Sequence, residues 1–190
     1  MAYKDIMIDI ETISTRPNAM MISLAAIKFD PFDDNSFNDG QEITIETLKM
    51  NTFCRKIDPE SYTWDAHVDE GTLNWWSQQD QHILDEAFSD DNLSSIQDTL
   101  KDFYRWCGVF DRVWANGAAF DTIIIESACR SLGRGWPWKY HQVRDYRTVF
   151  KLVKVEQPNI SKHHPLWDCW AQIVGLQRSL KVLGVKTFDV

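Results

Sequence analysis

The sequence predicts an α/β fold with a mixed central sheet flanked by helices. Two observations predict it. Strand-like segments come first, at residues 3–12, 20–29 and 50–57, and helix-like segments then mix with a further strand. The composition agrees, because 44% hydrophobic and 25% charged residues are ordinary for a folded globular chain. A length of 190 residues fits one core, so we expect a single domain over residues 1–190.

The first strand carries two carboxylates within an apolar run. Because alternate side chains of a strand share a face, Ile6, Ile8 and Ile10 face one side, and Asp9 and Glu11 face the other. Burying the strand brings two negative charges together in a poorly solvated place, which is costly unless something positive compensates. The natural partner of paired carboxylates is a hard cation such as Mg²⁺ or Mn²⁺. The pair therefore indicates a metal-dependent enzyme.

The remaining elements follow from periodicity and turn residues. Pro17 and Asn18 suit a turn between the first two strands, and residues 31–47 read as an acidic exposed loop or hairpin tip. Residues 112–115 read as a short buried strand. Apolar spacing predicts helices at residues 69–88 (with a break near 78–80), 92–106, 121–132, 145–153 and 168–183.

Charge and cysteine content narrow the class of protein. The net charge of −8 argues against a general electrostatic binder of nucleic acid, although an acidic enzyme site neutralised by metal remains compatible with it. The four cysteines form no CxxC pair, which argues against a zinc site and favours free thiols in a reducing compartment. We see neither a signal peptide nor a membrane span, and we expect a cytoplasmic location.

Two further carboxylates lie where helices are predicted to begin. Asp121 follows a strand and a glycine-containing turn, and the dipole of a helix N-terminus favours its ionised form. Asp168 follows His163, His164 and Pro165, and proline suits a first helical turn. Taken alone, the first reads as an N-cap aspartate and the second as a solvated one, so it is the combination that is specific.

The order of these residues resembles the DEDDh group of 3′→5′ exonucleases, which have the RNase H-like fold of DnaQ-type proofreading exonucleases. The chain runs Asp-x-Glu on the first strand, Phe-Asp at a helix start and His-x₄-Asp near the end. The segments 116–121, 73–79 and 144–148 resemble a phage and bacterial subgroup, known as exodeoxyribonuclease VIII-like or phage exonuclease A-like. Its members are described as 3′ exonucleases that prefer single strands, of DNA in some cases and RNA in others.

The resemblance implies roles for five residues. Asp9, Glu11, Asp121 and Asp168 would hold two Mg²⁺ or Mn²⁺ ions, which stabilise the attacking and leaving oxygens of phosphodiester hydrolysis. A histidine would act as general base, because its pKa lies close to working pH. His163 has the x₄ spacing of the group, whereas His164 has the x₃ spacing of a sister group that uses tyrosine there. We favour His163 and expect His164, which precedes a proline, to stabilise the turn.

Substrate contacts are expected from Thr12, Trp75, Asn116 and Phe120. Trp75 is the candidate for stacking on a base, since Trp76 shares helical spacing with Leu73 and is expected to be the buried one. For Asp145 and Arg147, which match the subgroup, we expect a structural salt bridge. The resemblance also implies single-stranded DNA or RNA 3′ ends as partners, a nucleoside 5′-monophosphate as product, and a homodimer as in many relatives.

Four functions remain open at this point. The first is a 3′→5′ exonuclease on single-stranded nucleic acid, with DNA favoured. The second is an RNA-specific exonuclease with the same catalytic residues, such as an oligoribonuclease-like or tRNA-trimming enzyme. The third is a catalytically silent RNase H-like module that binds nucleic acid or a polymerase, against which the retention of all five positions counts. The fourth is a generic metal phosphatase, for which no aspartate nucleophile motif or histidine-rich metal site is evident.

Overall fold

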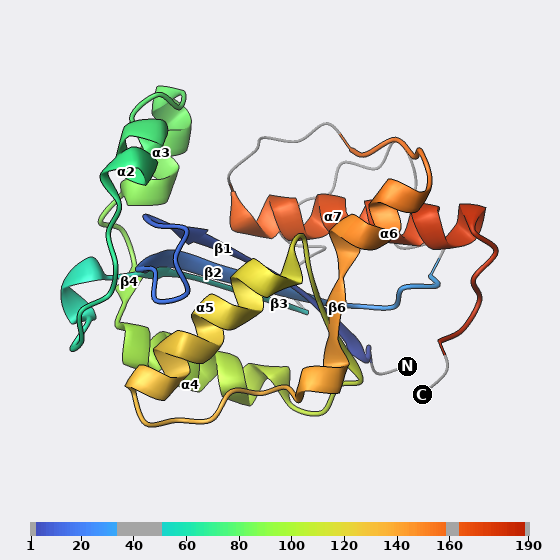
Figure 1. The fold of residues 1–190 in the computed structure, drawn as a ribbon, viewed down its shortest axis with the longest axis horizontal. Helices are drawn as coiled ribbons and strands as arrows, with labels where there is room; N and C mark the ends of the chain where they lie inside the picture. Colours follow the sequence, from blue (N-terminus) through green and yellow to red (C-terminus); the bar gives the residue numbers. More distant parts are fainter. Residues whose placement is uncertain (1–2, 34–50, 159–163, 189–190) are drawn as a thin grey trace.

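A six-stranded mixed sheet forms the centre of the molecule (Figure 1), in a computed structural model that describes residues 3–33, 51–158 and 164–188. The strand order is β4-β3-β2-β1-β5-β6. β1 (Asp5–Thr12), β2 (Met21–Phe29) and β3 (Thr52–Ile57) pair antiparallel. β5 (Arg112–Ala115) pairs parallel with β1, and β6 (Val143–Asp145) and β4 (Leu93–Ser94) pair parallel at the two edges. This confirms the α/β class and the mixed sheet.

Helices cover both faces of the sheet (Figure 1). α4 (Ile96–Cys107) and α5 (Ala118–Ser131) pack on one face, and α6 (Tyr146–Leu152) and α7 (Pro165–Val182) pack on the other. The short helices α2 (Glu70–Trp76) and α3 (Gln81–Phe88) lie beyond one end of the sheet. Single turns of 3₁₀-helix, η1 (Pro59–Ser61) and η2 (Tyr140–Gln142), complete the described elements.

The two faces of β1 pack into different cores, as its alternation predicts. Ile6, Ile8 and Ile10 belong to the core beneath α4 and α5, whereas Met7 belongs to the core beneath α7. All four side chains are at most 5% exposed. The face of β1 that carries Met7 and Asp9 is therefore covered by α7, which fixes where the carboxylates can meet other groups.

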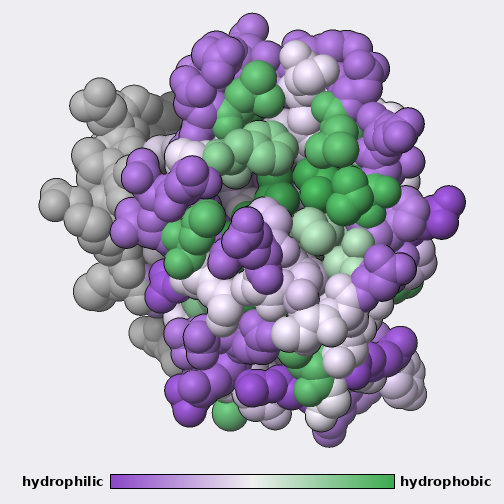
Figure 2. All heavy atoms as spheres, turned by 90° about the vertical axis from the view of Figure 1, so that its left-hand side faces the viewer, coloured by the Kyte–Doolittle hydropathy of each residue, from purple (hydrophilic) through white to green (hydrophobic). Residues whose placement is uncertain are grey.

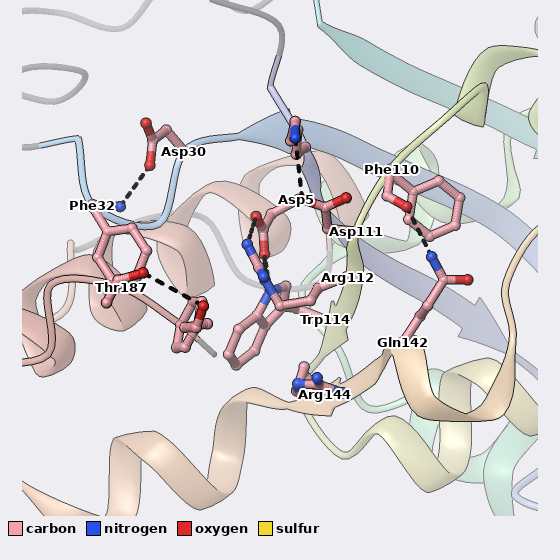
Figure 3. A network of polar contacts seen from close by, with 12 residues as sticks. Asp5, Asp30, Phe32, Phe110, Asp111, Arg112, Trp114, Gln142, Arg144 and Thr187 are labelled. Atoms are coloured by element: carbon pink, nitrogen blue, oxygen red, sulfur yellow. Dashed lines mark hydrogen bonds and ion pairs between the residues drawn. The ribbon is translucent and has the colours of Figure 1, made fainter. Parts of the chain in front are cut away.

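A buried ion pair anchors the first residue of β1, at the opposite end of the strand from Glu11 (Figure 3). The Arg112 guanidinium donates to both oxygens of Asp5 at 2.7 and 2.8 Å, and the Trp114 indole donates to Asp5 at 2.7 Å. The Arg112 guanidinium also lies over the ring of Phe188, with its central carbon 4.6 Å from the ring centre. Because both charges are partnered, their burial is tolerated and the β1–β5 register is fixed.

Several predicted boundaries are corrected by the structure. The predicted helix 92–106 begins at Ile96, because Leu93 and Ser94 pair with β3 and Ser95 caps the helix. The helix predicted from residue 121 begins at Ala118. The break predicted near residues 78–80 is confirmed between α2 and α3. The predicted loop at 31–47 lies almost entirely outside the described residues.

The structure also bears on the state of the cysteines and on the search for a membrane span. The four cysteines are free thiols, and three of them are buried, as predicted. Among the described residues, we find no helix that combines the length and the apolar character needed to span a membrane.

Candidate active site

Three carboxylates converge where β1 meets the start of α7. One oxygen each of Asp9, Glu11 and Asp168 lie within 4.8 Å of one another. Asp9 and Glu11 come from the face of β1 that α7 covers, and Asp168 comes from the first turn of α7. The arrangement is an all-oxygen donor set of the kind that hard divalent cations prefer.

Asp121 reaches the same place from the other side of β1. Its Oδ1 accepts a hydrogen bond from the backbone N–H of Ile10 at 3.3 Å, and the side chain is buried. Asp121 lies in the first turn of α5, but it is not the N-cap, because Gly117 holds that position with φ at +102°. The reading of Asp121 as an N-cap aspartate is therefore wrong, and its carboxylate is directed at β1.

The site makes ionisation of these carboxylates unfavourable. Burial, together with the charges of Asp121, Glu11 and Asp168, raises the pKa of Asp9 well above its ordinary value. Burial and the neighbouring Asp168 and Asp121 raise the pKa of Glu11 from 4.5 to about 8. Burial also raises the pKa of Asp121 to about 7, although backbone hydrogen bonds and Arg147 oppose the shift. Crowded carboxylates of this kind are stabilised in their ionised form by a cation.

Gln172 is a site residue that the sequence analysis missed. It lies on α7 one turn after Asp168, and its Nε2 donates to Asp9 Oδ1 at 2.8 Å. Its Oε1 is buried and has no hydrogen-bond partner among the described residues. A buried acceptor beside Asp9 fits a hydrated cation, whose water ligands would donate to it. The i, i+4 spacing from Asp168 is the sequence signal that places Gln172 on the same helix face.

The turn between β5 and α5 is held by the N-cap residue of α6 and by a residue in its first turn. Asp145 accepts from the Ala118 backbone N–H at 2.8 Å and also caps α6 through Thr148. Arg147 donates to the Asn116 carbonyl at 2.7 Å and to its side-chain oxygen at 3.3 Å. Burial opposes the shift, but hydrogen bonds from Ala118 and Thr148 and the charge of Arg147 lower the pKa of Asp145. The two residues therefore have a structural role, and their hydrogen bonds fix the turn that delivers Asp121.

The tryptophans of α2 divide as predicted into one exposed and one buried. Trp76 is 2% exposed, and its indole N–H donates to the Thr12 carbonyl at 2.9 Å, which ties α2 to the end of β1. Trp75 is 43% exposed and lies edge-on to Trp76. The Thr12 hydroxyl donates to the Ser14 carbonyl at 2.7 Å, so that hydroxyl already has a protein partner.

Apolar side chains gather around α2 and α3, on the face of the molecule drawn in Figure 2. Among the exposed large hydrophobic residues are Leu73, Trp75, Phe88 and Leu93. Because Trp76 links α2 to the residue that follows Glu11, this apolar surface begins beside the carboxylates. A ligand with a charged part and a flat apolar part fits such a neighbourhood.

Of the two histidines before α7, the structure describes only His164. His163 lies outside the described residues. His164 is the N-cap of α7, and its Nδ1 accepts from the Leu166 backbone N–H at 3.1 Å. Its Nε2 lies 3.1 Å from Glu86 of α3. Burial lowers the pKa of His164, and Glu86 opposes that shift. The structure therefore gives His164 the turn-stabilising contact that was predicted for it.

Phe120 directly precedes Asp121, and Asn116 lies in the turn that leads into α5. Phe120 is half-buried against the core beneath α5, and Asn116 is exposed. Both lie at the same end of β5 and α5 as the carboxylates.

A mixed sheet whose first strand carries paired carboxylates, joined by two more from helix starts, defines an RNase H-like nuclease fold. The complex of E. coli exonuclease I with single-stranded DNA shares this fold (TM-score 0.62, 14% identity, covering 96% of this chain and 41% of that one). The nuclease domain of 3′hExo, a DEDDh family member bound to rAMP, shares it too (TM-score 0.56, 10% identity, covering 98% of this chain and 96% of that one). The chain spans less than half of the length of exonuclease I.

The sequence places the chain in a family. It belongs to the 3′-5′ exoribonuclease Rv2179c-like domain family, which matches residues 4–178. A curated relative, an exodeoxyribonuclease of Enterobacteria phage T4, is 27% identical over an alignment of 209 positions that covers 93% of this chain and 89% of the relative. The chain is therefore a 3′→5′ exonuclease, a hydrolytic nuclease with an acidic cluster suited to divalent cations.

Proposed function

We propose that the protein removes nucleotides one at a time from the 3′ end of single-stranded DNA and releases nucleoside 5′-monophosphates. The observation that carries the proposal is the convergence of Asp9, Glu11 and Asp168 within 4.8 Å, beside the buried Asp121. This donor set suits the transfer of a phosphoryl group to water, because the charge that develops on the phosphate needs cationic stabilisation.

Asp9, Glu11, Asp121 and Asp168 would hold two divalent cations, Mg²⁺ or Mn²⁺. The carboxylate-only donor set supports this assignment, and so does the buried Oε1 of Gln172, which has no hydrogen-bond partner within the described part of the chain. When bound, the cations would polarise the scissile phosphate and make water more acidic. Gln172 holds Asp9 in one orientation, and the first turns of α5 and α7 fix Asp121 and Asp168.

His163 is our proposed general base. It immediately precedes His164, whose ring already contacts the Leu166 N–H and Glu86, and these contacts make His164 the weaker candidate for proton transfer. An imidazole near its ordinary pKa accepts a proton from water at neutral pH.

We further propose that the terminal nucleotide contacts Thr12, Trp75, Asn116 and Phe120. Trp75 is well exposed beside the site and offers an aromatic face or edge for a base. Phe120 directly precedes Asp121, and Asn116 lies in the turn that leads into α5. The Thr12 hydroxyl and carbonyl already have protein partners.

Single-stranded RNA is the second candidate substrate. The family description, a 3′-5′ exoribonuclease domain, favours RNA, whereas the phage T4 relative is an exodeoxyribonuclease and favours DNA. The same relative supports our assignment to the phage exonuclease A-like subgroup. The two substrates differ by the 2′-hydroxyl, so the contacts at the terminal sugar decide between them.

The test is digestion of matched single-stranded DNA and RNA oligonucleotides, labelled at the 5′ end, with Mg²⁺, with Mn²⁺ and with EDTA. We expect a ladder that shortens from the 3′ end only when a cation is present, with DNA the faster substrate. Asp9→Asn is the matched control and should yield no ladder. Equal binding by the wild type and this variant without cleavage in either metal would instead make the protein a silent binding module.

The homodimer and the cytoplasmic location are also proposals. The resemblance supports the first, and the free thiols support the second. Sedimentation equilibrium of the full chain tests the dimer.

A further inference from the structure

The segment from Arg130 to Arg144 differs in charge from the rest of the molecule. It holds four arginine or lysine residues, one histidine and no aspartate or glutamate, within a chain whose net charge is −8. It also holds three aromatic residues, Trp136, Trp138 and Tyr140. The segment connects the end of α5 to β6 (Figure 1) and contributes no carboxylate to the acidic site.

This segment forms an open hollow of about 590 Å³, a volume within the usual range for ligand sites. Its aromatic and cationic walls include Arg130, Trp136, Trp138, Lys139, Tyr140 and His141. Tyr140 is 90% exposed and lies edge-on to His141. So large an exposed ring beside cations offers a stacking surface to a ligand.

The inner wall of the hollow is fixed by a network around Glu126. The buried Trp138 donates its indole N–H to Glu126 Oε1 at 2.8 Å, and Arg130 donates to Oε2 at 3.2 Å. The Arg130 guanidinium also lies 4.7 Å from the ring centre of Trp136. Both oxygens of the carboxylate that lines the hollow are thus engaged by donors. Its charge is offset, and a negatively charged ligand can approach Lys139 at the rim.

The helix that carries Asp121 also leads to this hollow. Asp121 lies in the first turn of α5 and Arg130 in the last, nine residues later, which is about 13 Å along the axis. Ile123 and Arg130 are exposed on α5. A chain that enters the acidic site at its end can therefore follow α5 to the hollow.

We propose that this hollow is a second binding site for single-stranded nucleic acid, which holds nucleotides on the 5′ side of the one being removed. The proposal rests on the nuclease function proposed above. Lys139 and Arg130 supply phosphate contacts, which give affinity without sequence preference. Tyr140 supplies a stacking surface, and stacking tolerates any base. The site would give an acidic protein a local hold on an anionic strand.

The test compares Lys139→Glu/Tyr140→Ala with the matched control Lys151→Glu/Leu152→Ala, whose two exposed residues lie on α6, on the opposite face of the sheet. Both are made in an Asp9→Asn background with Mg²⁺, and fluorescence anisotropy measures binding of a dinucleotide and of a DNA strand of about 16 nucleotides. We expect the hollow variant alone to bind the long strand about tenfold more weakly, with dinucleotide binding unchanged.

Kinetics with Asp9 intact provide the second readout. The hollow variant should raise KM for the long strand and leave kcat, as well as both constants for the dinucleotide, unchanged. Long-strand binding equal to that of the control would overturn the proposal, and so would an equal loss at both lengths. A third outcome would also overturn the proposal, in favour of an acidic protein partner. In that outcome the wild type binds a polyglutamate peptide, and the hollow variant loses the peptide but binds DNA as tightly as before. If the wild type cleaves nothing, the nuclease proposal fails, while the anisotropy comparison still decides on the hollow.

Discussion

Asp9 and Glu11 are residues whose ionised forms the fold itself disfavours. Asp168 of α7 lies against the same side of β1, and the pKa values of Asp9 and Glu11 are raised by burial and by the neighbouring charges of Asp121 and Asp168. Such clusters mark functional sites because nothing in folding alone favours them. At the scale of single residues, the molecule is organised around this local excess of negative charge and the groups that orient it.

Gln172 is the residue whose replacement best tests that orientation. Gln172→Leu keeps the side-chain volume but removes the hydrogen bond to Asp9 Oδ1 and the buried acceptor beside it. Outer partners of metal ligands change affinity or activity by about 10- to 100-fold, so we expect a loss of that size in Mn²⁺ affinity measured by calorimetry. Unchanged Mn²⁺ affinity in a folded variant would show that Gln172 only packs.

The two histidines before α7 give a paired prediction. His163→Ala should lower kcat by orders of magnitude while Mn²⁺ binding persists, because a general base is lost and no carboxylate is. His164→Ala should lower stability by about 1 kcal/mol through the lost N-cap and leave most of the activity. Activity assays and thermal unfolding of both variants measure this. The reverse pattern would transfer the role of base to His164.

The sequence predicted the carboxylates better than their supports. Alternation along residues 3–12 placed Asp9 and Glu11 on one face, and that geometry is confirmed. The supports Gln172, Arg147 and Asp145 act across long sequence separations, and their partners depend on how α5, α6 and α7 pack. Local pattern carries no information on such packing, except for the i, i+4 relation of Gln172 to Asp168.

At the scale of elements, α6 and α7 are fitted together through a glycine. Gly175 of α7 faces the Tyr146 hydroxyl so closely that an added Cβ would collide with it. Tyr146 is 1% exposed and is hydrogen-bonded to Gln157. The close approach brings α6 to the β5–α5 turn, where Asp145 and Arg147 hold the segment that delivers Asp121.

Gly175→Ala should therefore destabilise the protein by about 1–3 kcal/mol through overpacking. Tyr146→Phe, which removes the colliding oxygen, should recover part of that loss in the double variant, and chemical denaturation of the full cycle measures the coupling. Gly135→Ala is the matched control, since its added Cβ meets no atom within 4 Å. Strictly additive effects of the two substitutions would show that the hydroxyl is not the obstacle.

Long elements were predictable from the sequence and short ones were not. β1, β2 and the periodic helices α4 and α7 carry enough apolar spacing to be recognised, within a few residues at their ends. β4 and β6 contain two and three residues, and they are strands only because β3 and β5 offer them partners. The start of α5 was missed because Gly117 replaces a polar N-cap side chain.

At the scale of the whole molecule, negative charge is unevenly distributed. The chain is strongly acidic, yet the segment from residue 130 to 144 has no carboxylate, and several of the remaining carboxylates crowd at the end of β1. The first arrangement draws an anionic strand to the protein, and the second draws cations to the site. The crowded carboxyl groups keep protons in the folded state, and a cation must displace these protons when it binds. Folding, protonation and cation binding are therefore linked.

That linkage predicts that, without metal, stability falls as the pH rises, which is the opposite of the usual effect of a carboxyl group whose pKa is lowered by folding. The pKa of Glu11 is raised from 4.5 in the unfolded chain to about 8 in the folded one, so the folded state retains a proton that the unfolded state has lost. The contribution of a raised carboxyl pKa to stability is complete below the unfolded value and is lost as pH rises through the folded value. In EDTA, Tm should therefore fall as the pH rises from about 4.5 to about 8.

With Mn²⁺ this fall in Tm should be smaller, because the cation takes the place of the proton. Free Mn²⁺ in excess over its dissociation constant also stabilises the folded state by mass action. Thermal unfolding across that range measures both curves. Glu11→Gln is the control: it should reduce the fall in EDTA to the part that Asp9 and Asp121 contribute, and it should weaken the response to metal. A Tm in EDTA that rises with pH across the same window would contradict the crowding of these carboxylates.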